Sequence, residues 1–308
     1  MKFPVPDVAS GKKRIRLPHA LQCLKCGEMK INSSGGNMTS AEIREKLCSP
    51  PVLAEKDQYR IKFAMTPEEI EAVFRLRYQV FKLEQGKNIK DCGQPGIDRD
   101  EFDQYCLHLV VEEKETGKAV GTYRVHPGPT ALTHELGFYS SHEFNIQGLN
   151  EIADQTFEMG RSCVSPDSRN GTVVALLWAG VSEIVGRSRL RYLVGCVSLE
   201  EMDPAAGWML YDYFVEQGRI SEKVTGTPLP CVKMDRPAPE VMEAFRKTHP
   251  VARTLIPPLF KGYLRMGAKI CSEPVFDADF GTIDFLILLD TGKLPERYQK
   301  HFNVVSAE

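Results

Sequence analysis

Apolar and polar residues follow a regular pattern from residue 59 onward. Residues 60–64 alternate in the way of a half-buried strand. Thr66, Pro67 and Glu69 then have the spacing of a capping box, in which the Thr and Glu side chains bind backbone N–H groups at the start of a helix. The pattern therefore predicts a strand followed by a helix that begins at Pro67.

The apolar stripe of this helix contains one charged residue. Ile70, Val73, Phe74 and Phe81 recur at helical spacing, and Arg77 lies in line with them. Burying a guanidinium is costly unless carboxylates pair with it. We therefore expect Arg77 to be partly buried and to bind acids from another part of the chain.

Further apolar segments alternate between strands and single helices, which predicts one mixed α/β (α+β) domain. A turn at residues 115–118 is expected to join two of the strands. The strands are expected at 107–111, 119–125, around Glu158, at 191–197 and at 285–289, and the helices at 173–181, 208–215 and 258–266.

The first part of the chain lacks this periodicity. Residues 1–54 are rich in Pro, Gly, Ser and Lys and are predicted to be a flexible leader, so that the folded domain would span residues 55–308. Met38 resembles a second start, and we expect residues 1–37 to be dispensable.

Composition limits the function classes. The net charge of −2 argues against bulk nucleic-acid binding, and no apolar run approaches the ~20 residues of a membrane span. Nine scattered cysteines favour a reducing compartment. We expect a cytoplasmic protein, with peripheral contact at the inner membrane surface left open. Cys23-x-x-Cys26 lacks a second pair, so no metal site is expected.

Residues 157–171 carry the clearest chemistry. A buried strand holds Glu158 and Arg161, an acid and a base three residues apart. In strict alternation the two side chains would face opposite sides of a sheet, but Gly160 indicates a bulge that would bring them to one face. A positioned carboxylate can remove a proton from an attacking amine. A purely structural ion pair is the alternative.

A polar loop follows this strand. Arg169, Asn170 and Gly171 precede a strongly apolar helix, and a helix N-terminus is a natural site for a phosphate. The alternative is a plain turn in which Thr172 caps the helix.

A second charged group lies between the first helix and the next strand. Asp98, Asp100 and Asp103 follow a Gly/Pro loop. They could bind a substrate ammonium while pairing with Arg77 and Arg124, or they could form a buried salt-bridge network that only fixes the loop. The sequence leaves both readings open.

The order of these motifs resembles the GNAT acyltransferase superfamily. Arg77-x-x-x-Phe81, Asp98-x-Asp100-x-x-Asp103, Arg124 and Glu158-x-x-Arg161 are similar to the pattern of acyl-homoserine-lactone synthases. The resemblance is closer to the ornithine-lipid N-acyltransferases, also called hemolysin-like, and includes residues 160–164, 169–171, 259–265 and 279–285. It implies a GNAT-like central mixed sheet, mostly antiparallel and flanked by helices.

The resemblance also implies a reaction, in which a 3-hydroxyacyl chain passes from acyl carrier protein to the α-amino group of an amino acid, with ornithine the best single choice. No permanently bound cofactor is implied, because the phosphopantetheine thioester of the carrier is the donor. The implied roles are catalysis by Glu158 and Arg161, substrate binding by Arg77, Phe81, Asp98, Asp100, Asp103 and Arg124, and phosphopantetheine binding by Arg169, Asn170 and Gly171.

Departures from the family pattern leave two alternatives. The tryptophan that lactone synthases carry after the Arg-x-x-x-Phe motif is missing, and Arg169-Asn170-Gly171 is a reduced phosphate loop that favours a carrier-protein donor over coenzyme A. The alternatives are an acyl-homoserine-lactone-type signal synthase and a binding module of the same fold with a decayed site.

Overall fold

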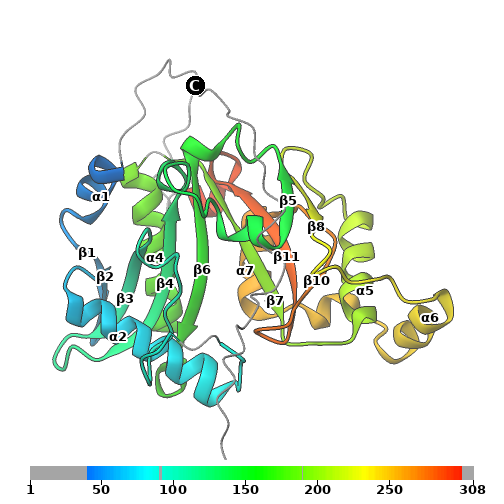
Figure 1. The fold of residues 1–308 in the computed structure, drawn as a ribbon, viewed down its shortest axis with the longest axis horizontal. Coiled ribbons are helices and arrows are strands. Elements are labelled where there is room, and N and C mark those ends of the chain that lie inside the picture. Colours follow the sequence, from blue (N-terminus) through cyan, green and yellow to red (C-terminus); the bar gives the residue numbers. More distant parts are fainter. Residues whose placement is uncertain (1–39, 90–91, 189, 300–308) are drawn as a thin grey trace, which may run out of the picture. The chain divides into compact units, whose positions relative to one another are not determined.

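A computed structural model describes residues 40–89, 92–188 and 190–299 of the 308-residue chain, and Figure 1 shows its fold. A large sheet forms its centre, with strand order β1-β2-β3-β4-β6-β7-β11-β10 and with β9 beside β11. The strands are β1 (Val52–Lys56), β2 (Tyr59–Phe63), β3 (Leu107–Glu113), β4 (Ala119–Pro127), β6 (Thr156–Val164), β7 (Tyr192–Leu199), β9 (Lys269–Ile270), β10 (Val275–Asp277) and β11 (Thr282–Asp290). A separate pair joins β5 (Phe144–Gln147) to β8 (Thr225–Pro228).

The sequence predicted four of the α-helices in the described part of the chain. The α-helices are α1 (Ser40–Cys48), α2 (Pro67–Arg77), α3 (Gly128–Ala131), α4 (Gly171–Ser188), α5 (Pro204–Glu216), α6 (Pro239–Thr248), α7 (Pro258–Met266) and α8 (Glu296–Gln299). The predicted capping box is present: the Thr66 hydroxyl accepts from the Glu69 N–H, and the Glu69 carboxylate accepts from the Thr66 N–H. A π-helix, Tyr78–Glu84, continues α2 and carries Phe81.

Helices cover both faces of the sheet, because β3 is apolar on both sides. Leu109 and Val111 pack in the main core together with residues of α4, whereas the intervening Val110 packs with Val73 and Phe74 of α2. Alternate residues of a strand point to opposite faces, so α2 and α4 lie on opposite sides of the sheet, as Figure 1 shows. The predicted mixed α/β fold with a mostly antiparallel sheet is confirmed.

One pair of neighbouring strands is parallel, and it opens partway along. β6 and β7 are joined by α4 and pair only at Thr156–Glu158 with Tyr192–Val194, although both strands continue beyond this point. Backbone N–H and C=O groups on the facing edges beyond Glu158 and Val194 therefore have no ladder partner in the other strand. The strands diverge at Glu158.

The predicted bulge in β6 is present, but a different residue takes the unusual conformation. Between the pairs Thr122–Cys163 and Arg124–Gly160, two residues of β6 oppose one residue of β4. Arg161 has a φ of 50°, in the left-handed region, whereas Gly160 does not. A non-glycine residue held in this region costs free energy, and such residues concentrate at functional sites.

The predicted C-terminal boundary of the leader, at residue 54, is wrong. Residues 40–54 were assigned to it, yet they form α1 and most of β1. Ile43 and Leu47 are 1% and 0% exposed and pack in the same core as α4. Two apolar positions were too few to indicate this helix from the sequence. The rest of the leader, and Cys23 and Cys26 within it, lies outside the described residues.

None of the helices in the described part of the chain combines the length and the apolar character needed to cross a bilayer.

Candidate active site

A cavity of about 280 Å³ lies where β6 and β7 diverge. Its walls include residues of both strands beyond their last pair, such as Met159 of β6 and Val197 of β7. The π-helix contributes Phe81, and α7 contributes Phe260 and Tyr263. One part of the wall is apolar and another is strongly charged, which is an arrangement suited to a substrate with both characters.

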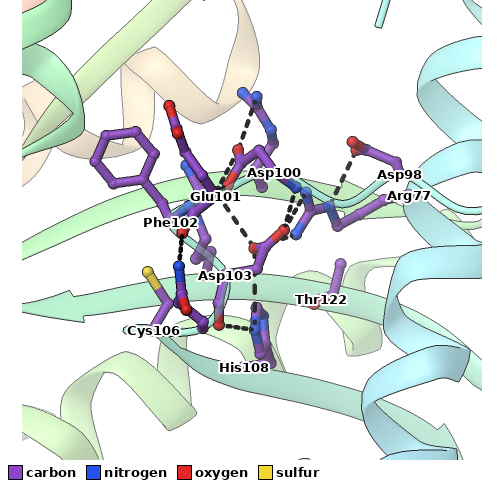
Figure 2. A network of polar contacts seen from close by, with 12 residues as sticks. Arg77, Asp98, Asp100, Glu101, Phe102, Asp103, Cys106, His108 and Thr122 are labelled. Carbon is purple, nitrogen blue, oxygen red and sulfur yellow. Dashed lines mark hydrogen bonds and ion pairs between the residues drawn. The ribbon is translucent and has the colours of Figure 1, made fainter. Parts of the chain in front are cut away.

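Behind this cavity lies an ion-pair network that neutralises the buried guanidinium of Arg77, as the sequence analysis expected. Arg77 is 0% exposed, and its guanidinium donates to Asp98 Oδ2 at 3.0 Å and to the two oxygens of Asp103 at 2.7 and 3.2 Å. Asp103 also accepts from Arg124 Nη1 at 3.3 Å. Figure 2 shows Asp103 between Arg77 and His108. These contacts confirm that Arg77 is buried among acids.

The same network holds Asp100. Arg124 Nη1 donates to the two Asp100 oxygens at 2.7 and 2.6 Å, and Arg161 Nη2 donates to Oδ2 at 3.2 Å. Burial by itself would raise the pKa of Asp103, but the charges of Arg77 and Arg124 outweigh it and lower that pKa. Asp100 likewise has a lowered pKa, because Arg124 and Arg161 outweigh its burial. Both acids are charged and already paired.

Two of these arginines also face the cavity. Arg124 and Arg161 line it, whereas Arg77, Asp98, Asp100 and Asp103 do not. The Arg161 guanidinium lies 4.6 Å from the centre of the Phe280 ring and 5.2 Å from that of Tyr139, and its Nε is buried with no hydrogen-bond partner among the described residues. Arg161 is therefore the cationic group best placed to receive a carboxylate.

Glu158 lines the cavity at the point of strand divergence, and its oxygens already accept several hydrogen bonds. Oε2 accepts from Tyr139 N at 2.6 Å, and Oε1 accepts from both the N–H and the hydroxyl of Ser140 at 2.7 Å. His126 Nδ1 lies 3.5 Å from Oε2. Burial would raise the pKa of Glu158, but the contacts with His126 and Ser140 outweigh it and lower the pKa.

A second acidic group in the cavity was missed by the sequence analysis. Glu143 and Asp284 are 8% and 5% exposed, and they lie with Cys196 in a cluster whose ligand atoms are within 4.8 Å of one another. Asp277 lines the same cavity. The only signal was an aspartate inside the apolar strand at 282–290, since nothing in the segment around Glu143 marks it as functional.

The loop predicted to bind phosphate has partners of its own. Arg169 makes a two-pronged ion pair with Glu84, at 2.5 and 2.7 Å. Asn170 Oδ1 accepts from the N–H groups of Thr172 and Val173, so Asn170 rather than Thr172 caps α4. Arg169, Asn170 and Gly171 do not line the cavity. Their role in donor binding stays a prediction.

The predicted site residues thus fall into three places. Phe81, Arg124, Glu158 and Arg161 meet at the cavity, and the bulge brings Glu158 and Arg161 to the same side as predicted. Arg77 and the three aspartates form the network behind it, and the 169–171 loop lies at the start of α4.

Known proteins with similar sequences point to one family. The chain is 32% identical over 261 residues to an L-ornithine N(alpha)-acyltransferase of Brucella abortus, which covers 82% of this chain and 91% of that protein. The chain belongs to the L-ornithine N(alpha)-acyltransferase family. A member from Rhizobium meliloti is 30% identical over 276 residues, covering 86% of this chain and 91% of the relative. The chain is therefore an acyltransferase, and this confirms the predicted enzyme class.

The family model for an acetyltransferase (GNAT) domain matches residues 76–179, from α2 into α4. Solved structures with a weaker likeness include the acyl-homoserine-lactone synthase LasI, with 10% identity and a TM-score of 0.44 over 82% of this chain and 100% of that one. Another is the synthase BjaI with bound ligands, with 15% identity and a TM-score of 0.41 over 77% and 80% of the two chains.

Proposed function

We propose that this acyltransferase moves a long 3-hydroxyacyl chain from the thioester of acyl carrier protein to the α-amino group of ornithine, giving a lyso-aminolipid. The family supports ornithine as the acceptor, since relatives at 30–32% identity carry that name. The observation that carries the proposal is the cavity itself, whose wall combines Arg161 and a group of acids with the aromatic side chains of Phe81, Phe260 and Phe280.

The proposed step is an aminolysis of a thioester. The acceptor ammonium first loses a proton to a base, and its nitrogen then attacks the thioester carbon. The new C–N bond forms as the C–S bond breaks, and the attacking nitrogen loses a second proton, which the leaving thiolate takes up. Negative charge on the carbonyl oxygen needs donors, and the unpaired backbone N–H groups beyond Glu158 in β6 suit this role.

The base is proposed to be Glu158, acting directly or through water. Its position at the strand divergence favours this role, whereas its lowered pKa and its three hydrogen-bond donors oppose it. A low pKa leaves the carboxylate ionised, as a base must be, but reduces its driving force for taking a proton. A loss of rate on substitution of Glu158 must therefore be separated from a loss of structure.

The apolar wall is proposed to hold the acyl chain. Phe81 and Phe280 meet edge to face with their centres 5.5 Å apart, and Phe260 of α7 also lines the cavity. Burial of each methylene contributes about 0.8 kcal/mol. Each methylene removed from the donor is therefore expected to lower kcat/KM by up to about fourfold, which would exclude acetyl donors.

A reconstituted assay tests the proposal. Purified enzyme, a long 3-hydroxyacyl carrier protein and ornithine are expected to give N-acylornithine, detected by mass spectrometry. S-adenosylmethionine replaces ornithine in a parallel reaction. Acylation of S-adenosylmethionine with lactone release would favour the signal-synthase alternative, and no product with either acceptor would favour a decayed site.

The donor is tested by offering the same acyl chain on carrier protein and on coenzyme A. We expect the carrier protein to give the higher kcat/KM, and we expect added salt to lower it mainly through the association rate, because carrier proteins are acidic. Arg187 and Arg191 lie near the C-terminal end of α4, but Arg187 pairs with Glu183 and Arg191 with Asp290, so neither is assigned to the docking surface. Equal or better use of acyl-coenzyme A would remove the carrier protein from the proposal.

A further inference from the structure

Two groups of buried acidic residues occur at or beside the cavity in the described part of the chain. They differ in whether lysine or arginine side chains pair with their carboxylates. Asp98, Asp100 and Asp103 are matched by Arg77, Arg124 and Arg161. By contrast, no lysine or arginine among the described residues lies within ion-pair distance of Glu143, Asp277 or Asp284. The sequence analysis assigned a substrate ammonium to the first group, whose carboxylates are already paired with arginines. The second group therefore provides the negative charge that is available to such an ammonium.

Separate elements bring the second group together at the cavity wall. Glu143 follows the 3-10 turn Tyr139–His142, and its Oε2 accepts from Cys196 Sγ at 3.3 Å. Asp284 lies on β11 opposite Ser198 of β7, and its Oδ1 accepts from the Thr282 hydroxyl at 2.8 Å. The Ser198 hydroxyl also donates to Asp284, so both acids are contacted by neutral donors. A carboxylate can accept further hydrogen bonds beyond these, which leaves acceptor capacity for a ligand.

The proximity of these buried acids favours the binding of a cation between them. Burial raises the pKa of Glu143, and the charge of Asp284 raises it further. Burial and the charge of Asp277 raise the pKa of Asp284 in the same way. Two carboxylates this close cannot both ionise cheaply unless a cation joins them.

Other charged groups face this space. Glu158 adds negative charge from β6, and Lys87 approaches from the segment after the π-helix. Lys87 Nζ is held by Glu200 at 2.6 Å, and its charge lowers the pKa of Asp284 without outweighing burial and the charge of Asp277.

A polar atom elsewhere on the cavity wall also lacks a hydrogen-bond partner. Arg161 Nε is buried and has no such partner among the described residues. Buried polar atoms without partners are rare and cost free energy. The cavity thus offers an unsatisfied cationic side and an unsatisfied anionic side, which fits a small ligand that carries both a carboxylate and a second ammonium.

We propose that Glu143 and Asp284 bind the side-chain ammonium of the acceptor amino acid, while Arg161 binds its carboxylate. This assignment rests on the proposed function and makes the two acids the residues that select cationic acceptors. Amino acids with neutral side chains would leave the acids without a counter-ion, and they are expected to be poorer acceptors for that reason.

The test compares ornithine with norvaline, which has the same carbon chain without the second amine. In the wild-type enzyme, kcat/KM for ornithine is expected to exceed that for norvaline by about 10- to 100-fold, the range for a hydrogen bond to a charged group. Glu143→Gln is expected to remove most of this preference, because it lowers kcat/KM for ornithine far more than kcat/KM for norvaline. Glu71→Gln is the control, since Glu71 is 55% exposed and pairs with Arg75 on α2.

Binding is measured separately from turnover. Ornithine is expected to raise the melting temperature of the wild-type protein more than norvaline does, and this difference should disappear in Glu143→Gln. Asp284→Asn repeats both measurements, so that poor folding of one variant leaves the other as the test.

The outcomes are distinct. Failure of the wild-type enzyme to acylate any amino acid would overturn the proposed function, and this assignment with it. Acylation of ornithine with an unchanged preference in Glu143→Gln and Asp284→Asn would overturn the assignment alone. So would a stoichiometric divalent ion whose removal by a chelator abolishes acylation, since Glu143, Cys196 and Asp284 would then be metal ligands.

Discussion

At the scale of the residue, Glu158 shows how one carboxylate can serve structure and chemistry together. Its oxygens fix Tyr139 and Ser140, and this orders the turn that leads to Glu143. Because that turn contributes to the cavity wall, Glu158 influences both the proposed proton transfer and the shape of the acceptor site.

Glu158→Gln is therefore expected to have two effects. As the base, Glu158 contributes about 10²–10⁴ in rate, so kcat should fall by that factor. The amide also presents its NH₂ group to a backbone N–H of Tyr139 or Ser140, which should lower the free energy of unfolding by about 1–3 kcal/mol. Denaturant unfolding and kcat, measured where the variant is fully folded, separate the two.

Ser140→Ala is the matched control for this experiment. It removes the hydroxyl that donates to Glu158 Oε1 and leaves the carboxylate in place. A fall in kcat as large as that of Glu158→Gln would assign Glu158 a positioning role instead of proton transfer.

At the scale of the element, the ion-pair network ties α2 to the loop that precedes β3. Asp103→Asn would leave the buried Arg77 with only Asp98, and it is expected to lower the free energy of unfolding by about 3–5 kcal/mol. The exposed pair Arg75–Glu71 lies on the same helix, and Glu71→Gln is expected to cost less than about 1 kcal/mol. Similar losses in both variants would contradict the argument.

Stability should also depend on pH with opposite signs at the two acidic groups. Asp103 has a folded pKa below its ordinary value of about 3.9, so its contribution is complete above that value and is lost as pH falls below it. Glu143 has a raised folded pKa, so it lowers stability as pH rises above about 4.3. Glu143→Gln should therefore stabilise the protein at pH 7, and urea midpoints from pH 3 to pH 8 check both signs.

At the scale of the whole molecule, the position of the N-terminal boundary decides which truncation the fold tolerates. Deleting residues 1–37 keeps α1 and is expected to leave activity and melting temperature nearly unchanged. Deleting residues 1–49 removes Ile43 and Leu47 from the core and should cost about 3–6 kcal/mol, since each such side chain contributes about 1.5–3 kcal/mol. Melting curves of the two proteins decide between them, and equal stability would show that α1 contributes nothing.

The sequence by itself determined several of the helices and strands, together with their local chemistry. Capping at Thr66, the strands around 60, 109, 123 and 287, the need of Arg77 for acids and the bulge beside Glu158 were all predictable, because propensity, periodicity and short-range hydrogen bonds act over a few residues. The family resemblance rests on motifs of the same local kind.

Only the tertiary structure decided which acids were neutralised and which remained free. The fold pairs Asp100 and Asp103 with arginines from three elements, α2, β4 and β6. These ion pairs leave little negative charge at the two aspartates for a substrate. Glu143 and Asp284 are far apart in sequence, and the turn before β5 brings Glu143 to β7 beside β11. Such proximity depends on strand order and on the divergence of β6 from β7, and no local pattern encodes it.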